Sequence, residues 1–135
     1  MKNYILILFI LPLAAVGQIK IGDHVNNGIV CRLDQTGRHG LVMTSQNVRD
    51  SCTYDSAIAI CKAMGWRLPD ATDWEAIYDV TIVKHLATLK STYYWEYSAT
   101  ASSRSAPARY SSTADGAIAF DRRKSRIAFI AVRKF

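Results

Sequence analysis

The sequence predicts an α+β domain built on antiparallel sheet. Residues 28–43 contain two strand-like apolar segments on either side of a turn, which is typical of a hairpin. Residues 54–64 and the segment after Asp70 instead carry apolar residues at helical spacing. Aromatic and β-branched segments return from residue 93 onward. Strands, two consecutive helices and further strands are the element order of this fold class.

A hairpin is predicted near the start of the domain. Gly28 to Asp34 forms its first strand, residues 35–38 supply the turn, and His39 to Met43 returns. A shorter alternation over Ile19 to Ile21 predicts one more strand before it.

The first helix is predicted from about Tyr54 to Met64, with Ser51 or Thr53 as its N-cap. The stretch from Gly65 to Asp70, Gly-Trp-Arg-Leu-Pro-Asp, then joins it to a second helix. Glycine can take the left-handed conformation that closes a helix, and the proline forces the preceding leucine into extended backbone. The linker therefore predicts a sharp helix–helix connection.

Asp70 is predicted to cap the second helix, with Asp73 or Glu75 in the first turn. A further helical piece is predicted within Thr81 to Leu89. The apolar face of the second helix comprises Trp74, Ile77 and Tyr78.

The C-terminal part returns to strands. Tyr93 to Tyr97 is strand-like, and the small polar residues from Ala99 to Pro107 predict a loop. Another strand is predicted over Ala108 to Ser112. The chain is then predicted to close with a hairpin, whose parts are Ala117–Phe120, the charged tip Asp121–Ser125, and Arg126–Val132.

Residues 1–17 have the pattern of a secretory signal, and residues 18–135 suit a single domain. Lys2 precedes an apolar run from Tyr4 to Leu13, and Ala15-Val16-Gly17 resembles a cleavage site. The run is short for a bilayer span, so we expect no transmembrane segment in the mature chain. The expected location is secreted or periplasmic, with cell-surface association left open.

Positive charge gathers in the C-terminal part. From Ile19 to Leu89 seven Lys/Arg face eight Asp/Glu, a balance of −1, whereas from Lys90 to Phe135 nine face three, a balance of +6. Such a surface attracts acidic glycans or nucleic acid. Export argues against nucleic acid, and solvated loop charges are the alternative interpretation.

The three cysteines, Cys31, Cys52 and Cys61, cannot all pair within one chain. Nine residues of helix span about 13 Å, beyond the reach of a Cys52–Cys61 disulfide. Any bridge would therefore include Cys31, and Cys61 is predicted to be a buried, unreactive thiol.

No catalytic or metal constellation is apparent, so we expect no enzyme, cofactor or metal. His24, His39 and His85 lack metal-ligand spacing, and no Gly-x-Ser-x-Gly elbow occurs. The acidic group after the linker is explained by helix capping.

Four segments occur in the order typical of a known family and span nearly the whole mature chain. They are Gly28–Val42, Cys61 with Gly65–Pro69, Tyr94–Thr100, and Val132–Arg133. They resemble the Lcl C-terminal-like domains of exported bacterial proteins, and the related major paralogous domains of fibre-degrading bacteria share the central motif. The resemblance implies a variant C-type-lectin-like fold, related to formylglycine-generating enzymes, and a role in adhesion to polyanionic glycans. Many relatives carry a cysteine where Ala131 stands here, so the partner of Cys61 in the family disulfide is missing.

Aromatic and cationic residues of the C-terminal part are the candidate binding residues, because aromatic faces stack on sugars and arginines pair with acidic groups. An exported, adhesin-like module for acidic polysaccharide or another envelope component is the first hypothesis. The alternative is a structural subunit of the cell surface acting through protein contacts. Trp66 and Arg67 are instead assigned to the core, and for Trp95 the family resemblance implies packing as the alternative to binding. The candidates are Trp95, Tyr97, Arg104, Arg109, Tyr110, Arg122, Arg123, Lys124 and Arg126.

Overall fold

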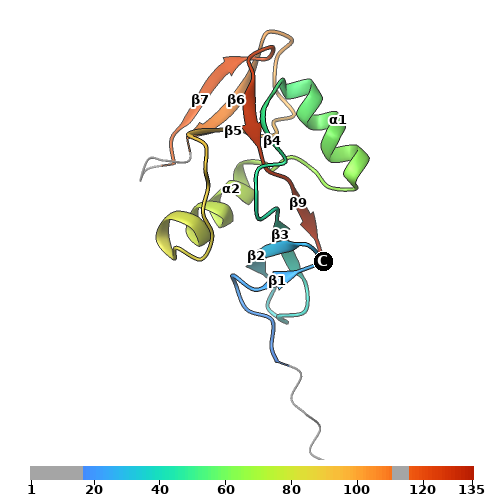
Figure 1. The fold of residues 1–135 in the computed structure, drawn as a ribbon, viewed down its shortest axis with the longest axis vertical. Coiled ribbons are helices and arrows are strands. Elements are labelled where there is room, and N and C mark those ends of the chain that lie inside the picture. Colours follow the sequence, from blue (N-terminus) through green and yellow to red (C-terminus); the bar gives the residue numbers. More distant parts are fainter. Residues whose placement is uncertain (1–16, 111–115) are drawn as a thin grey trace, which may run out of the picture.

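The computed structural model describes residues 17–110 and 116–135, which form an α+β fold of two helices and two sheets (Figure 1). Residues 1–16 of the predicted signal segment lie outside the described residues. The helices are α1 (Tyr54–Met64) and α2 (Ala71–Tyr78), and a π-helical turn, η1 (Asp79–Val83), continues α2. The strands are β1 (His24–Val25), β2 (Gly28–Leu33), β3 (Gly40–Met43), β4 (Arg49–Cys52), β5 (Tyr93–Trp95), β6 (Ser105–Tyr110), β7 (Ile118–Arg122), β8 (Ile127–Phe129) and β9 (Val132–Lys134).

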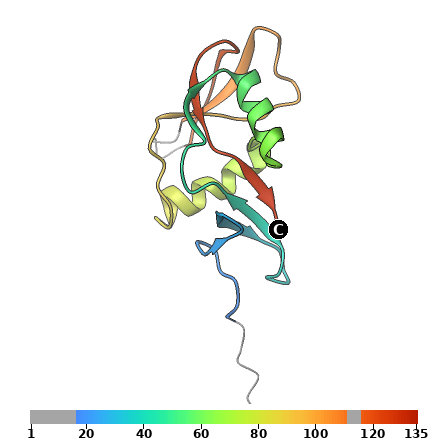
Figure 2. The same cartoon turned by 45° about the vertical axis from the view of Figure 1, so that its right-hand side comes forward.

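The strands form two sheets joined by the last part of the chain. One sheet has the order β1-β2-β3-β9 and the other has the order β4-β8-β5-β6-β7. Only the pairing of β5 with β8 is parallel among these described strands. Because β8 and β9 are nearly consecutive, residues 127–134 run from the second sheet into the first (Figure 2).

The predicted hairpin is confirmed as β2 and β3. Its antiparallel register runs from Ile29 opposite Met43 to Leu33 opposite Gly40, with a bulge between Val30 and Arg32. A β-carbon on Gly40 would lie 2.0 Å from the Arg32 carbonyl oxygen, so this close backbone approach requires glycine.

Helix α1 begins and ends where the sequence predicts, and α2 begins where it predicts, directly after Asp70. Thr53, one of the two predicted candidates, caps α1 by accepting a hydrogen bond from the Ser56 N–H, and Gly65 ends the helix at φ 74°. Asp70 and Asp73 form a reciprocal capping box at the start of α2. These caps fix the sharp connection between the two helices.

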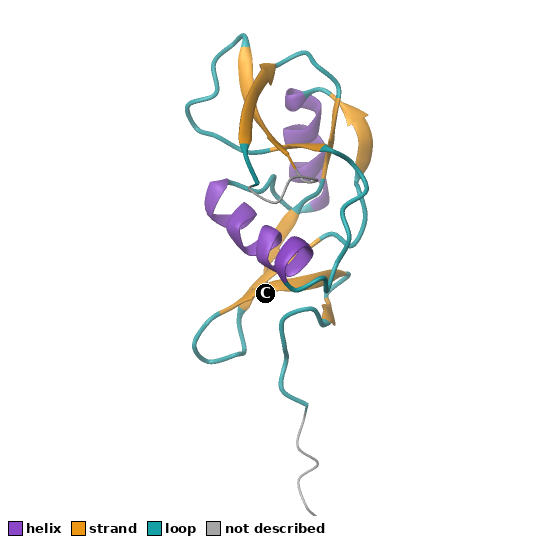
Figure 3. Cartoon of the chain, turned by 90° about the vertical axis from the view of Figure 1, so that its left-hand side faces the viewer, coloured by secondary structure: helices purple, strands orange, loops and turns teal. Residues whose placement is uncertain are grey.

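The core consists of two apolar clusters that share strand β8. Ile127 and Phe129 pack with α1, whereas Ala128 and the following Ile130 pack with α2. Successive strand residues point to opposite faces, so β8 is buried on both sides. The two helices, shown in purple in Figure 3, therefore cover different apolar clusters.

The closing hairpin predicted over residues 117–132 is wrong. β7 pairs with β6, whereas β8 lies between β4 and β5. The physical reason is burial: residues 127–132 are apolar without a break and all buried, which suits a central strand, while β7 alternates between exposed and half-buried positions.

Three smaller predictions also need correction. Ile19 to Ile21 is no strand, because the chain turns where the Asp23 N–H donates to the Lys20 carbonyl. The predicted loop over residues 99–107 ends earlier, since its small alanines fit beneath α1 as part of β6. The helical piece after α2 is η1, and it stops before His85, whose φ of 53° is left-handed.

Strand β4 has no counterpart among the predicted strands, because only one of its residues, Cys52, is buried.

Ser111 and Ser112, at the end of one predicted strand, lie outside the described residues. Among the residues described, no helix has the length and apolar character needed to cross a membrane.

Candidate functional site

Trp95, a predicted binding residue, lies in the core. It is fully buried, its indole N–H donates to the Cys52 carbonyl at 2.9 Å, and the Tyr54 ring meets it edge-on at 5.6 Å. A buried ring with a satisfied N–H is a packing residue. The burial of Trp95 therefore agrees with the packing role that the family resemblance implies, and it removes Trp95 from the candidate binding residues.

Arg109 is also enclosed rather than exposed. Its guanidinium lies 2.7 Å from a carboxylate oxygen of the buried Glu96 and donates to the Gly116 carbonyl at 3.1 Å. It also lies 6.0 Å from the centre of the Trp74 ring. Because this cation already has a buried partner, it is not available to an external ligand.

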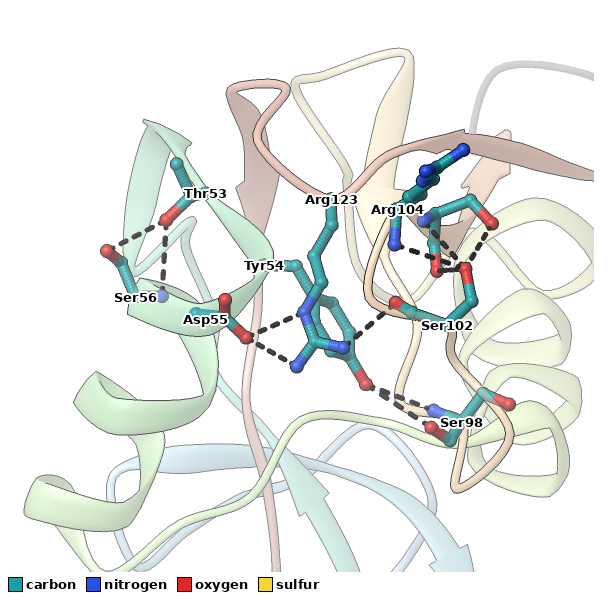
Figure 4. Close-up of polar contacts among 9 residues, drawn as sticks. Thr53, Tyr54, Asp55, Ser56, Ser98, Ser102, Arg104 and Arg123 are labelled. Atoms are coloured by element: carbon teal, nitrogen blue, oxygen red, sulfur yellow. Dashed lines mark hydrogen bonds and ion pairs between the residues drawn. The ribbon is translucent and has the colours of Figure 1, made fainter.

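Arg123 connects three segments at the N-terminal end of α1 (Figure 4). Its guanidinium donates to Asp55 at 2.9 and 2.6 Å and to the Ser102 carbonyl at 3.0 Å, and it lies 5.2 Å from the Tyr54 ring centre. Its own carbonyl accepts from the Tyr54 N–H at 3.3 Å. These contacts hold the segment after β7 against α1 and against the loop before β6.

That loop is fixed at two further points. The Tyr54 hydroxyl accepts from the Ser98 N–H at 3.3 Å and donates to the Ser98 carbonyl at 3.5 Å. The Ser102 hydroxyl accepts from the backbone N–H groups of Arg104 and Ser105 at 3.3 and 2.9 Å (Figure 4). The residues around Tyr97 are therefore held in a defined position beside α1.

Two adjoining cavities form a groove along α1, which we call the α1 groove. The larger, about 640 Å³, is lined by Trp66, Arg67, Asp70 and Lys134, among others. The smaller, about 440 Å³, is lined by Tyr54, Asp55 and Arg123, among others. Both cavities share three lining residues, which lie at their junction: Ile58, Lys62 and Tyr97.

Tyr97 is the exposed aromatic residue at this junction. Its side chain is 45% exposed, and its backbone N–H donates to the Pro69 carbonyl at 2.7 Å. The hydrogen bond ties its position to the linker between the helices. The predicted binding residue Tyr97 thus presents a ring to the α1 groove.

The α1 groove has an excess of positive charge. Its acids already face arginines: Asp55 lies 2.6 Å from Arg123, and Asp70 lies 3.9 Å from Arg67. The remaining cations are Lys62 and Lys134, which are exposed and have no ion-pair partner among the described residues. These two lysines are therefore available to an acidic ligand.

Arg67, which the sequence assigns to the core, is only half-buried and lines the groove. It pairs with the buried Asp73 through both nitrogens, and Arg32 of β2 adds a third contact at 3.3 Å. Burial by itself raises the pKa of Asp73, but hydrogen bonds from Arg67 and Asp70 outweigh it and hold that pKa below its usual value.

Trp66 is half-buried, and the guanidinium carbon of Arg133 lies over its ring, 4.9 Å from the ring centre. It therefore shapes the wall of the groove together with Arg67.

None of the other five predicted residues lines the α1 groove. Three exposed cations, Arg104, Arg122 and Lys124, lie beside Arg123, and we call these three the cationic rim. The backbone N–H of Arg123 donates to the Arg104 carbonyl. The Tyr110 and Tyr93 rings pack together at a tilt, with their centres 4.4 Å apart. The Arg126 guanidinium donates to the Ser51 carbonyl at 3.4 Å.

Lys62 and Lys134 were missed because nothing in the sequence relates a lysine of α1 to a lysine of β9. A partial signal existed, since Ile58 and Lys62 are four residues apart and so share one face of a helix.

All three cysteines are free and buried. Burial raises the pKa of Cys31 and of Cys61 to about 12. Cys61 borders the groove but is only 1% exposed, and its thiol stays protonated at neutral pH. The predicted burial of Cys61 is confirmed, and its low reactivity stays a prediction.

Within residues 17–110 and 116–135, no group of three or more His, Cys, Asp or Glu side chains could hold a metal ion. Comparison with protein-family models and with curated proteins finds no match to this chain.

Proposed function

We propose that this chain is an exported, non-enzymatic binding module that holds an acidic saccharide in the α1 groove. The observation that carries this proposal is the placement of Tyr97, a half-exposed ring, next to Lys62 where the two cavities meet. The resemblance to Lcl C-terminal-like domains, with their variant C-type-lectin-like fold, supports the same function, and the secretory pattern of residues 1–17 supports export.

The chemistry of the groove suits a sugar that carries carboxylate or sulfate. A pyranose ring stacks on the exposed face of Tyr97, while Lys62 and Lys134 supply point charges on the same side. Arg67 and Arg123 are occupied by Asp73 and Asp55, so they shape the groove and leave ligand contact to the lysines.

The first test is binding of the purified protein to acidic polymers (heparin, chondroitin sulfate and polygalacturonate) and to neutral dextran. We expect the acidic polymers to bind selectively, and more weakly at about 200 mM than at about 50 mM salt, because exposed charges are screened over shorter distances as salt rises. Equal binding of dextran would contradict the proposal.

Variants then locate the site. The double variant Lys62→Ala with Lys134→Ala, and Tyr97→Ala alone, should each weaken binding by about tenfold or more, equivalent to about 1.4 kcal/mol. The matched control removes Arg122 and Lys124 of the cationic rim, which changes net charge equally outside the groove. If the control weakens binding as much as the groove variants do, the ligand lies on the rim and the proposed site is wrong.

A further inference from the structure

Strand β7 forms an edge of the five-stranded sheet and has a partner on only one side among the described strands (Figure 1). Its register with β6 is unbroken from Ser105 opposite Arg122 to Arg109 opposite Ile118. Natural edge strands are usually blunted by a bulge, a proline or a lysine. β7, with the sequence Ile-Ala-Phe-Asp-Arg, has none of these.

The outward backbone groups of β7 follow from its ladder with β6. The Tyr110 N–H donates to the Ala117 carbonyl, and the Arg123 N–H donates to the Arg104 carbonyl. Hydrogen-bonded positions alternate along an antiparallel pair, so residues 117, 119, 121 and 123 bond to β6. The N–H and C=O groups of Ile118, Phe120 and Arg122 therefore point away from the sheet.

The same three residues place their side chains on one face of the strand. Phe120 is 77% exposed, the highest exposure among the large apolar side chains of the described residues, and Ile118 is 47% exposed. Arg122 follows at the end of the strand, next to Lys124 and Arg104. The edge thus changes from apolar at one end to cationic at the other.

Charge determines which occupant fits this edge. Four cations (Arg104, Arg122, Arg123 and Lys124) and two acids (Asp55 and Asp121) lie at the Arg122 end of β7, a balance of +2. A second copy placed antiparallel about Phe120 would set Arg122 opposite Ile118, and both chains carry a formal charge of +6. An acidic segment is therefore complementary in charge to this edge, whereas a second copy of the positively charged chain is not.

We propose that β7 is a docking edge for an extended, acidic segment of a partner protein, which adds to the sheet as an antiparallel strand. The segment carries an acidic residue opposite Arg122 and apolar residues opposite Phe120 and Ile118. Main-chain hydrogen bonds to the three outward residues hold it, and the side chains select it. This docking edge is separate from the α1 groove and does not depend on a saccharide ligand.

The probe is a fluorescein-labelled peptide, Glu-Thr-Glu-Thr-Val-Thr-Val, measured by fluorescence anisotropy with the full chain. In the proposed register its second glutamate faces Arg122 and its valines face Phe120 and Ile118. We expect saturable binding that N-methylation of the first valine abolishes, because that N–H points to β7. N-methylation of the preceding threonine, whose N–H points away, should leave binding intact. Equal effects of the two methyl groups would overturn the proposal.

Protein variants test the same edge without relying on one substitution. Phe120→Pro removes an outward N–H that β6 does not use, and Phe120→Thr removes the ring while keeping strand propensity. Both should weaken peptide binding by about tenfold or more, equivalent to about 1.4 kcal/mol. Val83→Thr, at another exposed apolar residue, is the matched control and should bind as the original chain does.

Sedimentation of the chain without peptide distinguishes a second copy from a partner. A monomer that binds the peptide supports the proposal. A dimer that Phe120→Pro converts to monomer would overturn it in favour of self-pairing, and absence of peptide binding to a folded monomer would also overturn it.

Discussion

Replacement of Asp73 tests how the linker motif holds the molecule together. The Asp73 carboxylate is 1% exposed and accepts hydrogen bonds from Arg67, from Arg32 at 3.3 Å and from the Asp70 N–H at 3.0 Å. It thereby joins the linker, β2 and the first turn of α2. Asp73→Ala removes all of these contacts at once.

The expected loss follows from the exposure of the partners. Removing one member of a buried ion pair costs about 3–5 kcal/mol when the other charge stays buried. Here the side chains of Arg32 and Arg67 are 37% and 41% exposed, so both can regain water. We therefore expect Asp73→Ala to lower the free energy of unfolding by about 3 kcal/mol, at the lower end of that range.

Urea unfolding followed by tryptophan fluorescence measures this loss. With a slope of about 1.5 kcal/mol/M, the midpoint should fall by about 2 M. Asp79→Ala is the matched control, because Asp79 pairs with Lys84 at 2.9 Å and both side chains are nearly half exposed. That surface pair should contribute about 0.5 kcal/mol. Equal midpoints for the two variants would refute the structural role of Asp73.

The same carboxylate predicts a pH dependence. Because the pKa of Asp73 lies below its usual value in the folded chain, its contribution is complete above about pH 4 and is lost as pH falls through the lower folded value. Asp73→Asn should remove this part of the acid destabilisation. A variant curve parallel to that of the original chain below about pH 4 would contradict the assignment.

Two further predictions concern the helix end and the thiols. Gly65→Ala should destabilise the chain by about 1 kcal/mol in the same urea assay, because alanine is strained at the φ of 74° that Gly65 adopts; an unchanged midpoint would contradict this. Cys31, Cys52 and Cys61 should resist a thiol reagent in the native chain and all react in guanidinium without reductant, since all three are free and buried. Fewer than three reactive thiols after unfolding would indicate a disulfide.

Helix boundaries could be predicted because their signals are local. Thr53 and Gly65 act on backbone groups within one turn of helix, so their roles follow from adjacent sequence. Strand partners depend on distant packing. Residues 127–129 look like half of a hairpin until β4 and β5 are known to be their strand partners and the two apolar clusters to cover both faces.

The candidate site was predictable only in part for the same reason. Tyr97 and Arg123 were found from residue type and do line the α1 groove. Residue type does not show burial, however, so Arg109 is a candidate although it pairs with the buried Glu96, and Trp95 is a candidate although it lies in the core. Lys134 lines the groove because an antiparallel β-bridge between Arg67 and Val132 holds β9 against the linker.

Arginines and lysines have different roles in the α1 groove. Arginine presents a planar fork of donors: Arg67 uses it on both carboxylate oxygens of Asp73, and Arg123 directs two nitrogens to one oxygen of Asp55. Lysine is a flexible point charge, and Lys62 and Lys134 are left exposed. Positive charge alone, taken from the C-terminal sequence, does not show which cations already have a carboxylate partner. In our proposal the arginines build the walls that let a lysine of α1 and a lysine of β9 face the same ligand.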